Sequence, residues 1–72
     1  MTTLTSIQDK QIAAELAAIA KHGNTANQRS VIFAARTRSR KAIQALGFDY
    51  RQALEAVTDA ADMVALKVAA NE

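Results

Sequence analysis

The sequence contains no cysteine, no proline and no tryptophan, and only two glycines among its 72 residues. Without cysteine the chain has no disulfide bond, no thiolate metal ligand and no cysteine nucleophile. Residues that break helices are scarce, and good helix formers such as alanine, glutamine, lysine and arginine are common. The composition therefore predicts an all-α fold.

Long apolar runs are also missing from the chain. No stretch approaches the roughly 18 apolar residues of a membrane-spanning helix. Residues 1–10 lack the basic segment followed by an apolar segment that marks a secretion signal. Because the absence of cysteine is also compatible with a reducing compartment, we expect a cytoplasmic protein with no membrane partner.

Large apolar side chains are few, although half of the residues are apolar. Much of that half is alanine, and a chain of 72 residues is near the lower size limit for folding alone. Ordering the chain costs roughly 1.5 kcal/mol per residue, against a gain of about 25 cal/mol per Å² of buried apolar surface, and alanine buries little. We therefore expect a single alanine-rich domain, residues 1–72, that forms a homo-oligomer such as a homodimer.

Both glycines, Gly23 and Gly47, stand where a residue that ends a helix belongs. Each is followed by a capping-box pattern, at residues 25–28 and 49–52, and residues 5–8 have the same form. These signals predict helices at about 6–22, 26–46 and 50–70. Because the connections are short, the helices are expected to pack as an antiparallel three-helix bundle.

The apolar residues of each predicted helix recur at helical spacing and form a stripe. In the first helix the stripe comprises Ile12, Leu16 and Ile19. In the second helix it comprises Val31, Ile32, Ala35, Ala42, Ile43 and Leu46, with Ser39 inside it. In the third helix it comprises Tyr50, Ala53, Leu54, Val57, Ala61, Val64, Ala65 and Val68. These residues are the predicted core.

Charge is unevenly distributed, although the net charge is only +2. The second predicted helix carries only basic charges, and the third carries an acidic row, Glu55, Asp59 and Asp62. On a helical wheel the basic residues fall into two groups. The main basic face comprises Arg29, Phe33, Arg36 and Arg40, and the secondary basic edge comprises Arg38 and Lys41.

The main basic face suggests a binding site for an anionic partner, with nucleic acid as the first candidate. Three guanidinium groups on one face can hold phosphates, and Phe33 can stack on a base. In a second interpretation the basic face is solvated and partly paired with the acidic residues of the third helix, and a second subunit covers Phe33. A third is an inhibitor or adaptor of the kind phages and plasmids encode, which binds an acidic host protein through this face or through the edge at Met63 and Leu66.

The corner at residues 42–53 has the spacing of a helix-turn-helix motif, with Gly47 in the turn and Ala53 six positions later. In that arrangement Tyr50, Arg51, Gln52 and Glu55 would face the DNA groove. Ile43, however, occupies a position where a small residue is usual, and the long third helix is acidic. A capped corner between two helices of a bundle explains the same residues, and it is the favoured interpretation.

The chain offers no constellation for catalysis, so we expect a protein that is not an enzyme and that needs no cofactor. The acidic row lies on one helical face, but no histidine or loop oxygen accompanies it as a metal ligand. His22 precedes Gly23 and is expected to interact with the carbonyl end of its helix. No nucleotide-binding loop and no metal signature is present.

We assign the chain to no family. The segment Asn27-Gln28-Arg29-x-Val31-x-x-Ala34-Ala35-Arg36-Thr37 resembles a stretch in small helical phage proteins that sequester cyclic nucleotide signals of bacterial defence. The resemblance covers about one helix. It implies a further alternative, in which the protein is a sponge for a small anionic nucleotide bound at a subunit interface.

Overall fold

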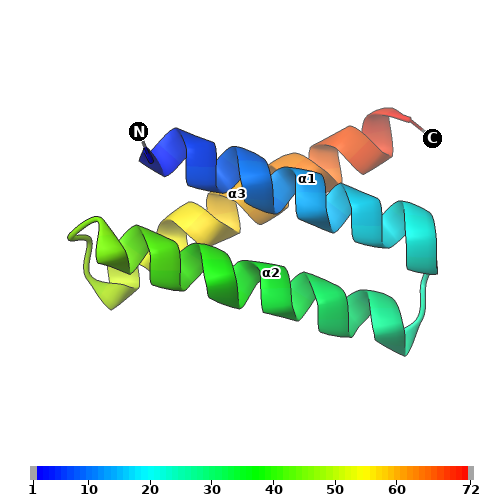
Figure 1. Cartoon of the computed structure of the whole chain (residues 1–72). Helices are drawn as coiled ribbons and strands as arrows, with labels where there is room; N and C mark the ends of the chain where they lie inside the picture. The colour runs from blue at the N-terminus through cyan, green and yellow to red at the C-terminus, as the bar shows by residue number, and fades with distance from the viewer. Residues whose placement is uncertain (1, 72) are drawn as a thin grey trace.

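A computed structural model describes residues 2–71, and these form three helices: α1 (Leu4–His22), α2 (Ala26–Ala45) and α3 (Tyr50–Ala70). Helices α1 and α2 lie side by side and antiparallel, as Figure 1 shows. Helix α3 begins beside the end of α2, crosses behind α1 and ends on the other side of α1 from α2 (Figure 1). No strand occurs in residues 2–71, so the prediction of an all-α, three-helix bundle is confirmed.

Helix α1 begins two residues earlier than the sequence predicted, because Thr3 and Ser6 cap it in place of the predicted Thr5 and Gln8. The Thr3 Oγ1 atom accepts a hydrogen bond of 3.1 Å from the Ser6 amide, and the Thr3 amide donates one of 3.0 Å to Ser6 Oγ. This is a complete capping box, with serine in the place usually taken by glutamate or glutamine.

The caps of α2 and α3 lie at the predicted residues. Thr25 Oγ1 accepts a hydrogen bond from the backbone N–H of Gln28 and donates one to the carbonyl oxygen of His22. These two bonds join the end of α1 to the start of α2. Asp49 and Gln52 form a complete capping box for α3. Between α2 and α3, Gly47 has a φ of +109°, a conformation that side chains disfavour.

The core is small and rich in alanine. Five of the nine buried apolar residues in the described chain are alanine, and the larger ones are Ile7, Ile43, Val57 and Val64. At one end of the bundle, Ile7 and Ile43 pack with Ala53, Ala56 and Val57. Because alanine buries little surface, this core provides only modest hydrophobic stabilisation.

The buried faces of α1 and α3 differ from the predicted stripes. In α1 the polar residues Gln11 and Glu15 are buried, whereas the predicted Ile12, Leu16 and Ile19 are only half-buried. In α3 burial shifts toward Ala56 and Ala60, and the predicted core residues Tyr50, Leu54 and Ala65 are exposed. One side of the α3 stripe is therefore left without a partner in this chain.

None of the three helices, in the residues described, combines the length and the apolar content needed to cross a membrane.

Candidate anion-binding surfaces

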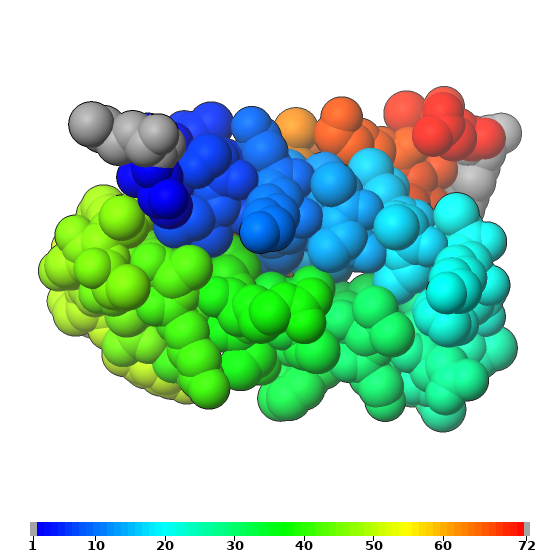
Figure 2. Space-filling view, viewed as in Figure 1, coloured from blue at the N-terminus to red at the C-terminus, as the bar shows by residue number. Residues whose placement is uncertain are grey.

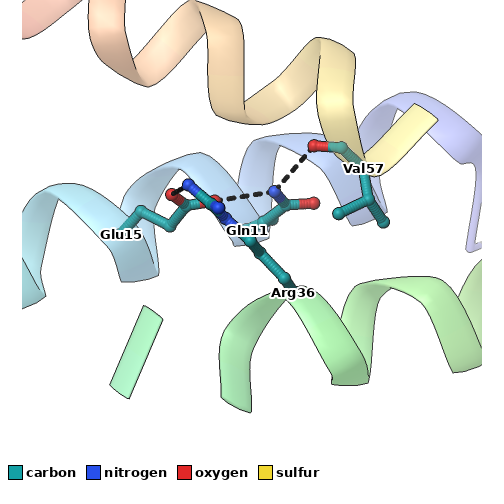
Figure 3. Close-up of polar contacts among 4 residues, drawn as sticks. All are labelled: Gln11, Glu15, Arg36 and Val57. Carbon is teal, nitrogen blue, oxygen red and sulfur yellow. Dashed lines mark hydrogen bonds and ion pairs between the residues drawn. The ribbon is translucent and has the colours of Figure 1, made fainter. Parts of the chain in front are cut away.

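Arg36, at the centre of the main basic face, is bound within the chain. Its Nη2 atom lies 2.8 Å from Glu15 Oε1 and its Nε atom lies 3.2 Å from Glu15 Oε2, a bidentate ion pair between α2 and α1 (Figure 3). The Glu15 side chain is 1% exposed and that of Arg36 is 45% exposed. Arg36 therefore uses two of its five N–H donors to neutralise a buried carboxylate, so its charge is already compensated within the chain.

Gln11 extends this ion pair into a network that joins all three helices. Its Nε2 atom donates to Glu15 Oε2 at 2.7 Å and to the carbonyl oxygen of Val57 at 3.1 Å, so the amide bridges α1 to α3 (Figure 3). Because Glu15 also binds Arg36 of α2, one continuous set of polar contacts crosses the interior of the bundle. These contacts compensate the burial of Glu15 and of the Gln11 Nε2 group, whereas Gln11 Oε1 has no partner in the described chain.

Arg40 also has partners within its own chain. Its Nη1 atom donates a hydrogen bond to Gln44 Oε1, and its guanidinium carbon lies 5.0 Å from the centre of the Tyr50 ring. The second distance is within the range of a cation–π interaction. Arg40 therefore fixes the last turn of α2 against the start of α3.

Arg29 and Phe33 complete the main basic face, and both are exposed. The Phe33 residue is 72% exposed, the most of any large hydrophobic residue in the described chain. The structure therefore divides the predicted face into two arginines with partners in their own chain, Arg36 and Arg40, and two exposed residues, Arg29 and Phe33.

The secondary basic edge lies on the other side of α2, toward α1. Arg38 and Lys41 are exposed and three residues apart, so they are neighbours on the helix surface. Arg38 and Lys10 of α1 both line a cavity of about 420 Å³ between the two helices. The cavity is lined by Thr2, Ser6, Ile7, Lys10, Gln11, Ala14, Ala35, Arg38, Ser39 and Ala42. Helices α1 and α2 form the face turned to the viewer in Figure 2.

Two buried polar atoms that belong to residues lining this cavity have no hydrogen-bond partner in the described chain, Gln11 Oε1 and Ser39 Oγ. A buried polar atom without a partner is costly, and native proteins nearly always satisfy it. The charge contributed to the cavity lining is cationic, from Lys10 and Arg38.

Other charged groups form no cluster that could hold a metal ion. Among residues 2–71, no three histidine or carboxylate side chains come close enough together to ligate one. A second ion pair lies within α3, where Arg51 Nε is 3.8 Å from Glu55 Oε1, and both side chains are exposed. Such a pair contributes little to stability.

Comparison with protein families, with curated proteins and with solved structures finds no match to this chain.

The sequence predicted the basic residues as a site but not the partners that occupy two of them. Glu15 and Gln11 carry no local signal for burial, because each is a common polar residue in a helix that is otherwise rich in alanine. Lys10 was also missed as a neighbour of Arg38, since only the packing of α1 on α2 brings them to one cavity.

Proposed function

We propose that this chain is a non-enzymatic binding protein for an anionic partner, with nucleic acid as the first candidate. The observation that supports this most is the charge of α2, which carries five basic residues and no acidic residue. Of these five, only Arg36 is paired with a carboxylate in the described chain. A helix with unneutralised cations attracts phosphates.

The contact surface that we propose consists of the secondary basic edge and Lys10. Arg38 and Lys41 are exposed on α2, and Lys10 is exposed across the cavity on α1. Thr2 lines the same cavity, and its hydroxyl group can add a hydrogen bond to a phosphate oxygen. The main basic face is the less suitable surface, because Arg36 and Arg40 have partners in their own chain.

Reversing the charge of this edge tests the proposal. The variant Arg38→Glu with Lys41→Glu is expected to bind single-stranded and duplex DNA and RNA at least tenfold more weakly at about 50 mM salt. The plot of log affinity against log salt concentration should become less steep by about 2, because two phosphate contacts are lost. Fluorescence anisotropy with labelled oligonucleotides measures both quantities.

A matched control is Arg51→Glu with Lys67→Glu, which makes the same change in net charge at two exposed positions of α3. It should retain most of the affinity if the proposed surface is the one that binds. Equal losses in the two variants would mean that only net charge matters. A wild-type protein that fails to bind any of these nucleic acids at low salt would refute the proposal.

A second candidate function is the binding of a small anionic ligand in the cavity between α1 and α2. The lining of the cavity favours it, because mainly apolar surface is combined there with two cationic residues, Lys10 and Arg38. A ligand with a hydrogen-bond donor, an apolar or planar body and an anionic group matches this lining, with the anion placed at Lys10 and Arg38. Nucleoside monophosphates and cyclic nucleotides have this chemistry.

Thermal unfolding in the presence of adenosine and guanosine monophosphates and their cyclic forms tests this candidate. A ligand at 100 times its dissociation constant should stabilise the protein by about 2.7 kcal/mol. The variant Lys10→Glu with Arg38→Glu should abolish the shift, because it reverses both charges proposed to hold the anion, and its fold should be retained because both side chains are exposed. The absence of any shift at millimolar nucleotide would count against nucleotides as the ligand.

A further inference from the structure

Helices α2 and α3 diverge from their connection, and an apolar groove lies between them. In Figure 1 the far end of α3 lies on the opposite side of α1 from the start of α2. The groove has a volume of about 350 Å³, with Ile32 and Arg36 on the α2 side and Val64, Ala65 and Val68 on the α3 side. It is therefore lined mainly by apolar groups and has the Arg36–Glu15 ion pair at its base.

The apolar surface continues outside the groove. Phe33 projects from α2 on the same side as Arg29 and Arg40. Tyr50 and Leu54, which share a face of α3 with Ala61 and Ala65, are exposed.

The chain as a whole exposes 4950 Å². This is roughly 600 Å² more than the ~4,300 Å² expected for a compact monomer of 7.7 kDa.

Charge on this face is complementary to itself. Arg29 and Arg40 border the face on α2, and the acidic row, Glu55, Asp59 and Asp62, borders it on α3. Because α2 and α3 run antiparallel from a short connection, Arg40 is level with Glu55 near that connection, and Arg29 is level with the part of α3 just beyond Asp62. A rotation of 180° about an axis parallel to the groove would place the basic border of one copy on the acidic border of the other.

We propose that this face binds a second copy of the chain and forms a twofold symmetric dimer. Phe33 of each copy packs on the alanine surface at Ala61 and Ala65 of the other copy, where small side chains leave room for an aromatic ring. Arg29 of each copy pairs with Asp62 of the other. The proposal does not depend on the proposed function, because the dimer uses the α2–α3 face and the anion surface uses the α1–α2 face.

Analytical ultracentrifugation of charge-exchange variants tests the dimer. Wild type should sediment as a dimer at micromolar concentration. Arg29→Glu and Asp62→Arg should each raise the dimer dissociation constant at least tenfold, because symmetry makes each substitution act twice. The combination Arg29→Glu with Asp62→Arg should restore most of the wild-type affinity, since it rebuilds the pair with its charges exchanged.

Two further variants test whether the α2–α3 face, and not another surface of the bundle, forms the dimer. Phe33→Asp should give a monomer with an unchanged helical circular dichroism spectrum, because Phe33 is largely exposed within one chain. Arg38→Glu, which makes the same charge change as Arg29→Glu but on the other side of α2, should leave the dimer intact. The proposal is overturned if wild type is monomeric up to about 1 mM, if Phe33→Asp dimerises as wild type does, or if the charge exchange fails to restore affinity.

Discussion

At the scale of single residues, the most unusual feature of the bundle is the fully buried carboxylate of Glu15. It is one of the two largest fully buried side chains in the described chain, and the other is Ile43. A carboxylate in this position is tolerated because Arg36 binds both of its oxygens and Gln11 donates to one of them. Replacing a buried ion pair by apolar residues often has little effect on stability, whereas removing one partner leaves a charge without compensation.

We therefore expect Arg36→Met to destabilise the protein by about 3 kcal/mol or more, because Glu15 loses its counter-ion. The double variant Glu15→Met with Arg36→Met should recover most of that loss, since no buried charge remains. Urea denaturation followed by circular dichroism measures both changes. If Arg36→Met is as stable as wild type, the ion pair does not compensate the burial of Glu15.

The same structural role makes Arg36 a poor position at which to probe binding. Loss of nucleic-acid binding in a variant of Arg36 can result from unfolding alone, because a small domain has only a few kcal/mol of stability to lose. Arg38 and Lys41 are better positions, since both side chains are exposed and neither contacts a carboxylate in the described chain.

At the scale of the helices, hydrogen bonds at the ends determine where each element begins. Asp49 Oδ1 accepts a hydrogen bond of 2.7 Å from the backbone N–H of Gln52, and the backbone N–H of Asp49 donates one of 3.1 Å to Gln52 Oε1. The carboxylate also interacts favourably with the positive end of the helix dipole. These contacts satisfy two amide groups that would otherwise be unpaired at the start of α3.

Asp49→Ala is expected to lower the free energy of unfolding by about 1 kcal/mol, because it removes the cap of α3. Asp49→Ser should lose much less, since a serine hydroxyl can accept the same hydrogen bond from Gln52. Thermal unfolding of the three proteins gives the comparison. Equal losses for alanine and serine would show that the negative charge, and not the cap, is what stabilises α3.

These local signals explain why the helices were predictable from the sequence and why much of the site was not. Gly23, Gly47, Thr25 and Asp49 act within a few residues, so the starts of α2 and α3 and the number of helices could be predicted. The start of α1 was predicted two residues late, because the sequence offers two possible caps. Thr5 and Gln8 match the usual capping-box pattern, but Thr3 and Ser6 form the cap that is observed.

Burial, in contrast, depends on contacts that are distant in sequence. Glu15 meets Arg36 across 21 residues, and Gln11 meets Val57 across 46 residues. In α1 the predicted core face, Ile12, Leu16 and Ile19, therefore lies beside the face that is buried, which contains Gln11 and Glu15. In α3 the predicted stripe was wider than a single chain can cover, and Tyr50, Leu54 and Ala65 are left exposed.

At the scale of the whole molecule, the bundle is elongated, with principal extents of 36 × 23 × 22 Å. Its two candidate surfaces lie on different sides of α2. A dimer formed through the α2–α3 face therefore leaves both copies of the α1–α2 surface open to solvent. Two basic edges related by a twofold axis would then be available to one anionic partner, which can raise the overall affinity without any new contact.

The polar network inside the bundle has one further consequence, which concerns how the helices align along their lengths. Faces made largely of alanine are nearly uniform, so apolar packing alone distinguishes poorly between alignments that differ by one turn. Sliding α1 by one turn against α2 would bring Gln11 or Ile19 to the position of Glu15 and leave the buried carboxylate without Arg36. We therefore expect the ion pair to favour the observed register over alignments shifted by one turn.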